Sequence, residues 1–208
     1  EKKVMKTNRL IALFAAGFLT LGACSDEFLD VPPANSLGDA QLQTKDGAEG
    51  LLVGAYAALN GVFGNRFEGP NHWVTGAILG GDANKGTDAG DYATINPIQR
   101  FEHDATQVDL NELWRGRYEG VARSNRVLAT VNAIEDELTA ADFARISGEA
   151  RMLRGHFYFD LKKHFNSIPL YDENATPDEV TATPSTRDVW AFIEADFQYA
   201  YDNLPETT

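Results

Sequence analysis

Cysteine is nearly absent from this sequence. It occurs once among 208 residues, at position 24. Because a disulfide needs two cysteines, none can form within these residues, and a folded domain here must be stabilised by its packed core. Hydrophobic residues make up 43% of the sequence, which fits a globular chain rather than a disordered one.

Positive charge is also scarce. The sequence has 18 Lys and Arg against 31 Asp and Glu, a net charge of −13. The first 23 residues hold four of these bases and one of these acids, so the remainder carries −16. Such a surface repels phosphate backbones and anionic headgroups, and we therefore expect no nucleic acid among the partners.

The sequence has no long apolar run. The uncharged run Leu10 to Leu21 has twelve residues. As a helix it would rise about 18 Å, well short of the roughly 30 Å of a bilayer core. A basic stretch precedes it and the small residues Gly22 and Ala23 follow, a pattern typical of a secretory signal peptide. We predict a signal peptide over residues 1–23.

The single cysteine directly follows this leader. Leu21 to Cys24 (LGAC) resembles the lipobox of bacterial lipoproteins, which implies that the thiol of Cys24 takes a diacylglyceryl group and that its freed amine is acylated. Several acyl chains anchor a protein firmly, because each buried CH₂ contributes about 0.8 kcal/mol and one chain alone holds only marginally. The alternative is a buried free cysteine. We interpret residues 24–43, with acids at 26, 27 and 30, as a lipidated acidic tether.

From Thr44 onward, apolar residues recur at the three- and four-residue steps of amphipathic helices. The first predicted helix follows Thr44 and ends near Gly61. The second is predicted over Asp109 to Glu135, with Asp109 and Glu112 as a start resembling a capping box. Its predicted inner face includes Trp114, Arg117 and Tyr118.

Two further helices are predicted near the end of the sequence. The third begins at Thr139, with Asp142 three residues on, and must end before Pro169. Its predicted inner face consists of Phe143, Ile146, Ala150, Leu153, Phe157 and Leu161. Its basic residues, at 151, 154, 162 and 163, are interpreted as a polar edge. The fourth is opened by Ser185 and Asp188 and ends at Pro205. No alternating β-branched run competes with these assignments, so the predicted class is mainly α.

The connections between these helices differ greatly in length. Only a few residues join the second and third helices, which predicts an antiparallel hairpin, the unit of TPR-like solenoids. A clean 34-residue repeat is absent, so the helical hairpin is as far as periodicity leads. By contrast, residues 65–108 are too long for an ordinary connection, and we predict a long irregular loop insertion there.

Five stretches of the sequence resemble, in order, the SusD-like (RagB/SusD) family of outer-membrane nutrient-binding lipoproteins. One is EARMLRGHFYFDLKKHFNSIPLYDE, residues 149–173, and it is the ordered set together with the lipobox that is specific. The others are CSDEFLDVPP, GLLVGAYAAL, GGDANKG and LWRGRYEGVARSNRVLATV, residues 24–33, 50–59, 80–86 and 113–131. Members are usually far longer, so we expect residues 44–208 to be an N-terminal α-helical portion of the family's fold, truncated at its C-terminus.

The resemblance implies a function in nutrient capture. Such proteins are lipid-anchored to the outer membrane, face outside, bind oligosaccharides or other nutrients, and deliver them to a SusC-like TonB-dependent transporter. Acids after the anchor also resemble the surface-export signal of Bacteroidetes lipoproteins. Binding of peptide by the same arrangement is one alternative, and a purely structural lipoprotein is another.

The predicted loop holds the residue types that bind sugars. Aromatic planes stack on the C–H faces of sugar rings, and amides and carboxylates bind their hydroxyls. We therefore take as candidate ligand-binding residues Trp73, Asp82, Asn84, Lys85, Asp88, Asp91 and Tyr92. The alternative is an ordinary solvated loop with Trp73 packed inward. Trp114 and Tyr118 lie on a helical face and are predicted to be core residues.

The sequence gives little support to catalysis or to a bound cofactor. His156 and His164 are eight residues apart with no carboxylate motif, and no phosphate-binding glycine motif occurs. The segment that begins at Asp82 resembles a calcium loop, but Thr87 and Ala93 replace the EF-hand glycine and glutamate. Calcium stays open. A paired-carboxylate glycoside hydrolase is the enzyme alternative, but no carboxylate pair can be inferred across loops, so we expect no enzyme.

Overall fold

The computed structural model describes residues 42–62, 73–86, 88 and 90–206 of the chain. The predicted signal peptide, Cys24 and all but the last two residues of the predicted tether lie outside these ranges, and their assignments stay predictions. Within the described ranges none of the helices is both long enough and apolar enough to cross a bilayer.

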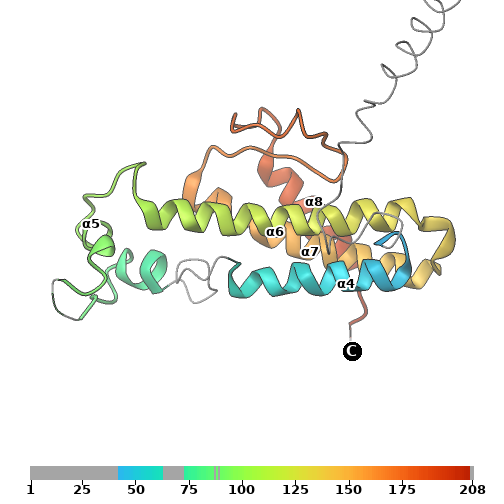
Figure 1. Ribbon diagram of the computed structural model, residues 1–208, viewed down its shortest axis with the longest axis horizontal. Helices are drawn as coiled ribbons and strands as arrows, with labels where there is room; N and C mark the ends of the chain where they lie inside the picture. The colour runs from blue at the N-terminus through green and yellow to red at the C-terminus, as the bar shows by residue number, and fades with distance from the viewer. Residues whose placement is uncertain (1–41, 63–72, 87, 89, 207–208) are drawn as a thin grey trace, which may run out of the picture. The chain divides into compact units, whose positions relative to one another are not determined.

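Four long helices account for most of the described structure (Figure 1). They are α4 (Lys45–Ala57), α6 (Val108–Ala133), α7 (Ala140–Phe165) and α8 (Val189–Asn203). Short helical segments join them: η1 (Ala58–Asn60), η2 (Trp73–Ile78), η3 (Ala93–Ile95), α5 (Asn96–Gln99) and η4 (Glu135–Glu137). The described ranges contain no strand, and the predicted mainly α class is confirmed.

Three of the four predicted helix starts are confirmed by their capping bonds. The hydroxyl of Thr44 accepts a hydrogen bond from the Gly47 amide at 3.1 Å, and that of Thr139 accepts one from the Asp142 amide at 3.1 Å. The carboxylate of Asp188 accepts from the Trp190 amide at 2.9 Å. These bonds satisfy backbone donors that have no partner within the helix.

The predicted start of α6 at Asp109 is wrong. The helix begins at Val108, and Gln107 caps it by accepting hydrogen bonds from the amides of Asp109 and Leu110. The Asp109 carboxylate is buried and accepts a bond from the Tyr92 hydroxyl at 3.0 Å instead. A tertiary contact, which local sequence does not reveal, therefore replaces the predicted cap.

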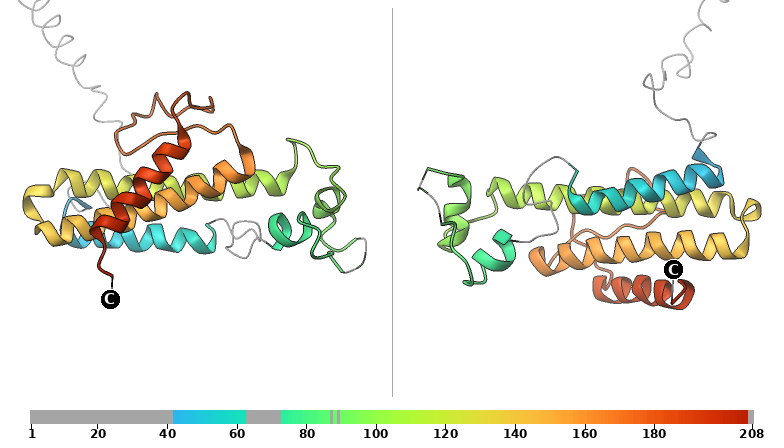
Figure 2. Two further views of the ribbon diagram at one scale, coloured as in Figure 1. Left: turned by 180° about the vertical axis from the view of Figure 1, so that it is seen from behind. Right: turned by 90° about the horizontal axis from the view of Figure 1, so that it is seen from below.

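Helices α6 and α7 form the predicted antiparallel hairpin through a short connection that contains η4. Figure 2 shows α7 between α6 and α8, and α7 also contacts α4. The predicted inner face of α7 is confirmed at its fully buried positions: Ile146, Ala150, Leu153, Phe157 and Leu161. On α6, Gly120 lets the ring of Phe157 lie against the helix backbone, so the two helices approach closely.

Arg154 is not on a polar edge, as the sequence predicted, but in the core. Its side chain is 2% exposed and forms two hydrogen bonds, at 2.7 and 2.8 Å, with the carboxylate of Asp196 on α8. A third bond, from Nη1, reaches the amide oxygen of Asn125 on α6 at 2.8 Å. A buried charge requires such partners, and here they join three helices.

Candidate functional site

The described part of residues 73–107 packs onto the end of the bundle at which α6 begins (Figure 1). The predicted long loop is less irregular than expected, because its described part contains a π-helical turn, η2, and the short helices η3 and α5. Five buried side chains give this segment and α6 a small core of their own: Val74, Ile78, Ile95, Ile98 and Leu113. The segment is therefore held in place as a platform beside α6.

The two aromatic residues predicted to bind ligand lie next to each other. The rings of Trp73 and Tyr92 stack with centroids 6.5 Å apart, and both side chains are partly buried against the small core. Tyr92 has a left-handed backbone (φ 43°) and its hydroxyl donates to Asp109. Because that bond and the packing orient both rings, one function of the pair is to hold the loop against α6.

The polar residues predicted to bind ligand lie on the surface of the same segment. Asp82, Asn84, Asp88 and Asp91 are exposed, and Lys85 donates a hydrogen bond from Nζ to the backbone carbonyl of Asp91. The side-chain oxygen of Asn84 accepts from the Gly86 amide at 3.0 Å and so closes a local turn. Their role in ligand binding stays a prediction.

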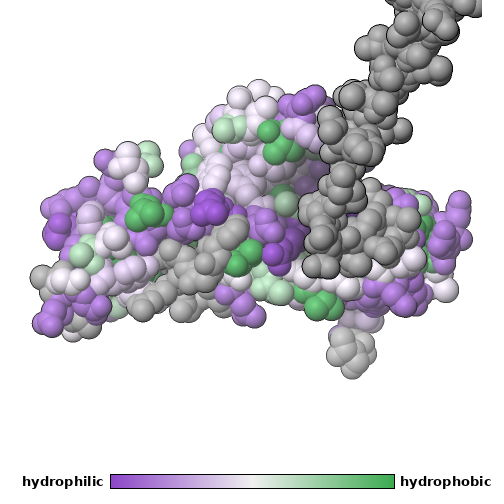
Figure 3. All heavy atoms as spheres, viewed as in Figure 1, coloured by the Kyte–Doolittle hydropathy of each residue, from purple (hydrophilic) through white to green (hydrophobic). Residues whose placement is uncertain are grey.

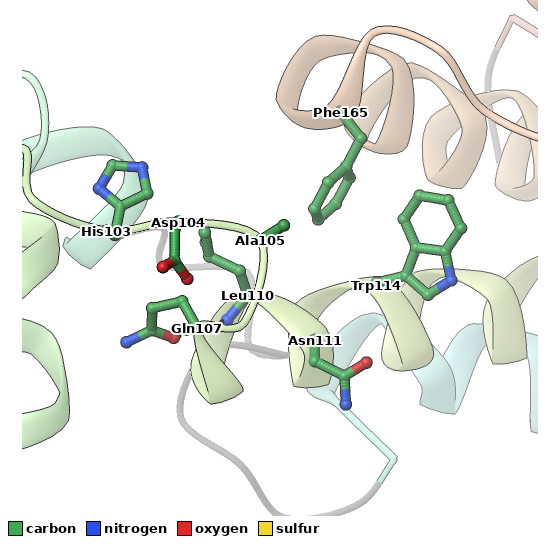
Figure 4. A pocket seen from close by; sticks show the side chains of 8 residues that line it. All are labelled: His103, Asp104, Ala105, Gln107, Leu110, Asn111, Trp114 and Phe165. Carbon is green, nitrogen blue, oxygen red and sulfur yellow. Dashed lines mark hydrogen bonds between the residues drawn. The ribbon is translucent and has the colours of Figure 1, made fainter.

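None of the seven predicted residues lines the cavity found beside this segment. That cavity has a volume of about 420 Å³ and eight lining residues: His103, Asp104, Ala105, Gln107, Leu110, Asn111, Trp114 and Phe165. They come from the connection after α5, from the first two turns of α6 and from the last residue of α7. Figure 4 shows the rings of Trp114 and Phe165 on one side and His103 with Asp104 on the other.

The aromatic wall of this cavity is held by ring contacts and a hydrogen bond. The rings of Trp114 and Phe165 meet edge to face at 5.0 Å, and Trp114 also contacts the ring of Tyr118 at 4.7 Å. The Tyr118 hydroxyl donates to the carbonyl of Pro169 at 2.8 Å, and burial raises the pKa of Tyr118. The prediction that Trp114 and Tyr118 pack against the core is thus confirmed, but Trp114 keeps one part open to the cavity.

The polar wall faces the aromatic one. The Nδ1 atom of His103 is buried and has no hydrogen-bond partner among the described residues. Asp104 accepts hydrogen bonds from the hydroxyl and the amide of Thr106, which lower the pKa of its carboxyl group. Asn111 is exposed one turn along α6. A cavity with aromatic walls and a few convergent polar groups suits a small polar ligand with apolar faces.

Sequence reasoning missed most of this cavity because its residues are split between a loop and two helices. A partial signal exists: Gln107, Asn111 and Trp114 are spaced by four and three residues and share one helical face. Phe165 follows more than 50 residues later in the sequence, and only the folded hairpin brings it to Trp114. Metal ligands do not gather here or elsewhere in the described ranges, where no three His, Cys, Asp or Glu side chains form a metal-binding group.

Comparison with known proteins identifies the family. A SusD-like family model, described as "Starch-binding associating with outer membrane", matches residues 27–208. The chain belongs to the SusD-like family. A curated SusD-like protein of Bacteroides ovatus is 30% identical over 208 residues, which cover 97% of this chain and 36% of that relative.

Solved structures agree on the SusD-like fold. A SusD superfamily protein from Bacteroides vulgatus matches with a TM-score of 0.64 at 20% identity, over 80% of this chain and 36% of that one. A laminarin-binding SusD-like protein matches with a TM-score of 0.60 at 25% identity, over 77% of this chain and 34% of that one. A SusD-like carbohydrate-binding protein from Bacteroides fragilis matches with a TM-score of 0.59 at 21% identity, over 80% of this chain and 33% of that one. This SusD-like chain, with its TPR-like hairpins, therefore spans about a third of the length of these relatives.

Proposed function

We propose that this SusD-like protein binds oligosaccharides at the cell surface without cleaving them. The observation that carries the proposal is the cavity in which Trp114 and Phe165 face Asn111 and Asp104. Sugar rings stack on aromatic planes by their C–H faces, while their hydroxyls hydrogen-bond to amides and carboxylates. The laminarin-binding relative and the family's description as starch-binding support the same ligand class.

Binding without cleavage agrees with the lining of the cavity. Glycoside hydrolysis ordinarily uses two carboxylic acids on opposite sides of the scissile bond. Among the described residues, the lining of this cavity includes a single carboxylate, that of Asp104. Incubation of the purified protein with a bound oligosaccharide should therefore return it at its original length, and shortened products would point to the hydrolase alternative.

Asn111 and Trp114 provide the mutational test of the binding site. We expect Trp114→Ala to weaken retention of a bound glycan, laminarin among the first to be tried, by at least about tenfold, roughly 1.4 kcal/mol. Asn111→Ala should weaken it as well without disturbing the fold, because this side chain is exposed. Trp190, 42% exposed on α8, provides the matched control. If Trp190→Ala reduces affinity and the two cavity variants do not, ligand binds elsewhere.

We further propose that the protein is anchored to the outer membrane through lipid on Cys24, faces outside, and delivers its ligand to a SusC-like TonB-dependent transporter. The lipobox-like sequence before Cys24 and the family's description as outer-membrane associated support this arrangement. Cys24→Ser should release the protein into the soluble fraction. A variant that still pellets with membranes after a salt wash would contradict the lipid anchor, and native purification without a TonB-dependent transporter would contradict the partnership.

A further inference from the structure

We propose that the cavity selects neutral saccharides over anionic ones and that Asp104 is the residue that makes this selection. The inference rests on the proposed function, because it concerns which saccharides enter the cavity. It derives from the charges that surround the aromatic wall of Trp114 and Phe165.

Hydrogen bonds from Thr106 favour the ionised form of Asp104, which lines the cavity. Its Oδ1 accepts hydrogen bonds from the Thr106 amide at 2.8 Å and from the Thr106 hydroxyl at 2.6 Å. Such bonds stabilise the carboxylate over the neutral acid. Oδ2 has no hydrogen bond to the described residues, so it can accept a hydrogen bond from a hydroxyl of a neutral sugar, whereas a sugar carboxylate placed there would bring a second negative charge beside it.

Among the described residues, no lysine or arginine lines the cavity to compensate this charge. Over residues 73–107 the sequence has two bases, Lys85 and Arg100, against five acids. Both bases are engaged: Lys85 with the Asp91 carbonyl, and Arg100 with the Glu102 carboxylate at 2.7 Å. In Figure 3 this end of the molecule is largely hydrophilic, as its excess of acids leads one to expect.

The basic residues on the adjoining helices are engaged as well. Arg115 on α6 is paired with Glu112 at 3.0 Å. At the end of α7, Lys162 donates to the Asn166 carbonyl at 2.6 Å, and Lys163 is paired with Asp160 at 2.9 Å. Because no lysine or arginine of the described residues lines the cavity, an anionic sugar stacked on the aromatic wall would face the Asp104 carboxylate without a pairing cation there, and such like-charge placement is a common means of rejecting a ligand.

The test compares matched ligands that differ in charge. The full-length protein is titrated with laminarin and other neutral glucans and with the same glucans oxidised to carboxylates at C6. Titrations are run at low salt and about pH 8, where histidine side chains are ordinarily neutral. We expect the neutral form to bind at least about tenfold more tightly than the oxidised form. This ratio of affinities should be smaller at high salt, because added ions screen the repulsion.

Two variants separate Asp104 from the general acidity of the chain. Asp104→Asn retains an oxygen that can accept from Thr106 and removes the charge, so it should bring the ratio of affinities close to one. Asp136→Asn, in η4 at the far end of α6, removes an equal charge remote from the cavity and should leave the ratio unchanged. Equal effects of the two variants would overturn the assignment to Asp104.

Failure of the inference and failure of the proposed function give different results. If the protein binds the oxidised glucans as tightly as the neutral ones, or more tightly, charge selection is wrong and saccharide binding stands. If it retains neither form of any glucan, while circular dichroism shows native helix content, the proposed function fails and the selection by Asp104 fails with it.

Discussion

Adding one methyl group at Gly120 should destabilise the protein, because the contact between α6 and α7 leaves no space for it. A Cβ built at Gly120 lies 2.5 Å from Cε2 and Cζ of Phe157, about 1 Å inside normal van der Waals contact. The Phe157 side chain is fully buried, so its ring cannot move into solvent. Either the ring leaves its preferred rotamer or the helices separate.

The expected magnitude combines two opposing effects. Overpacking of a well-packed core costs about 1–3 kcal/mol, and the short distance here favours the upper end. Replacing Gly by Ala inside a helix gains about 1 kcal/mol of helix propensity. The free energy of unfolding of Gly120→Ala should therefore be about 2 kcal/mol lower than that of the unmodified protein. For a domain of this size, that difference lowers the melting temperature by about 4–8 °C.

Gly54 in α4 supplies the matched control, since a Cβ there meets nothing within 4 Å. Urea unfolding followed by circular dichroism should show Gly54→Ala stabilised by up to about 1 kcal/mol, so the two variants should differ by about 3 kcal/mol. Phe157→Leu in the Gly120→Ala background should recover part of the difference, in a double-mutant cycle. A Gly120→Ala variant as stable as Gly54→Ala would refute the close approach of α6 and α7.

Two further predictions concern buried ionisable groups. Asp196→Ala leaves the Arg154 guanidinium without its main partner, so the free energy of unfolding measured in urea should fall by about 3–5 kcal/mol. The exposed Glu194→Ala is the control and should lower it by less than about 0.5 kcal/mol. Burial lowers the pKa of His156 below 6.5, so unfolding takes up a proton under acid conditions and stability falls as pH drops through this range. His156→Gln should therefore make the free energy of unfolding depend less on pH. An unchanged slope of that free energy against pH, between about pH 7 and 5, would contradict the prediction.

Local sequence was sufficient to identify the four long helices, but not the cap of α6 or the short helices η2, η3 and α5. The helix starts at Thr44, Thr139 and Asp188 could be predicted because a capping bond joins residues two or three apart and depends on little else. The inner face of α7 followed from spacing alone, since apolar side chains three and four residues apart must share one side of a helix. The family resemblance likewise rested on ordered local motifs, and the match over residues 27–208 confirmed it.

Tertiary structure decided which polar and small residues are buried and where the cavity lies. From the sequence, Arg154 is expected on the surface, but in the fold α8 places Asp196 beside it. From the sequence, Gly120 is expected only to weaken its helix, but in the fold it provides the space into which Phe157 packs. The cavity needs Phe165 beside Trp114, a contact between residues distant in sequence. Sequence alone thus determined the elements, because their signals are periodic and local, whereas burial of charge and the shape of a site depend on which elements meet.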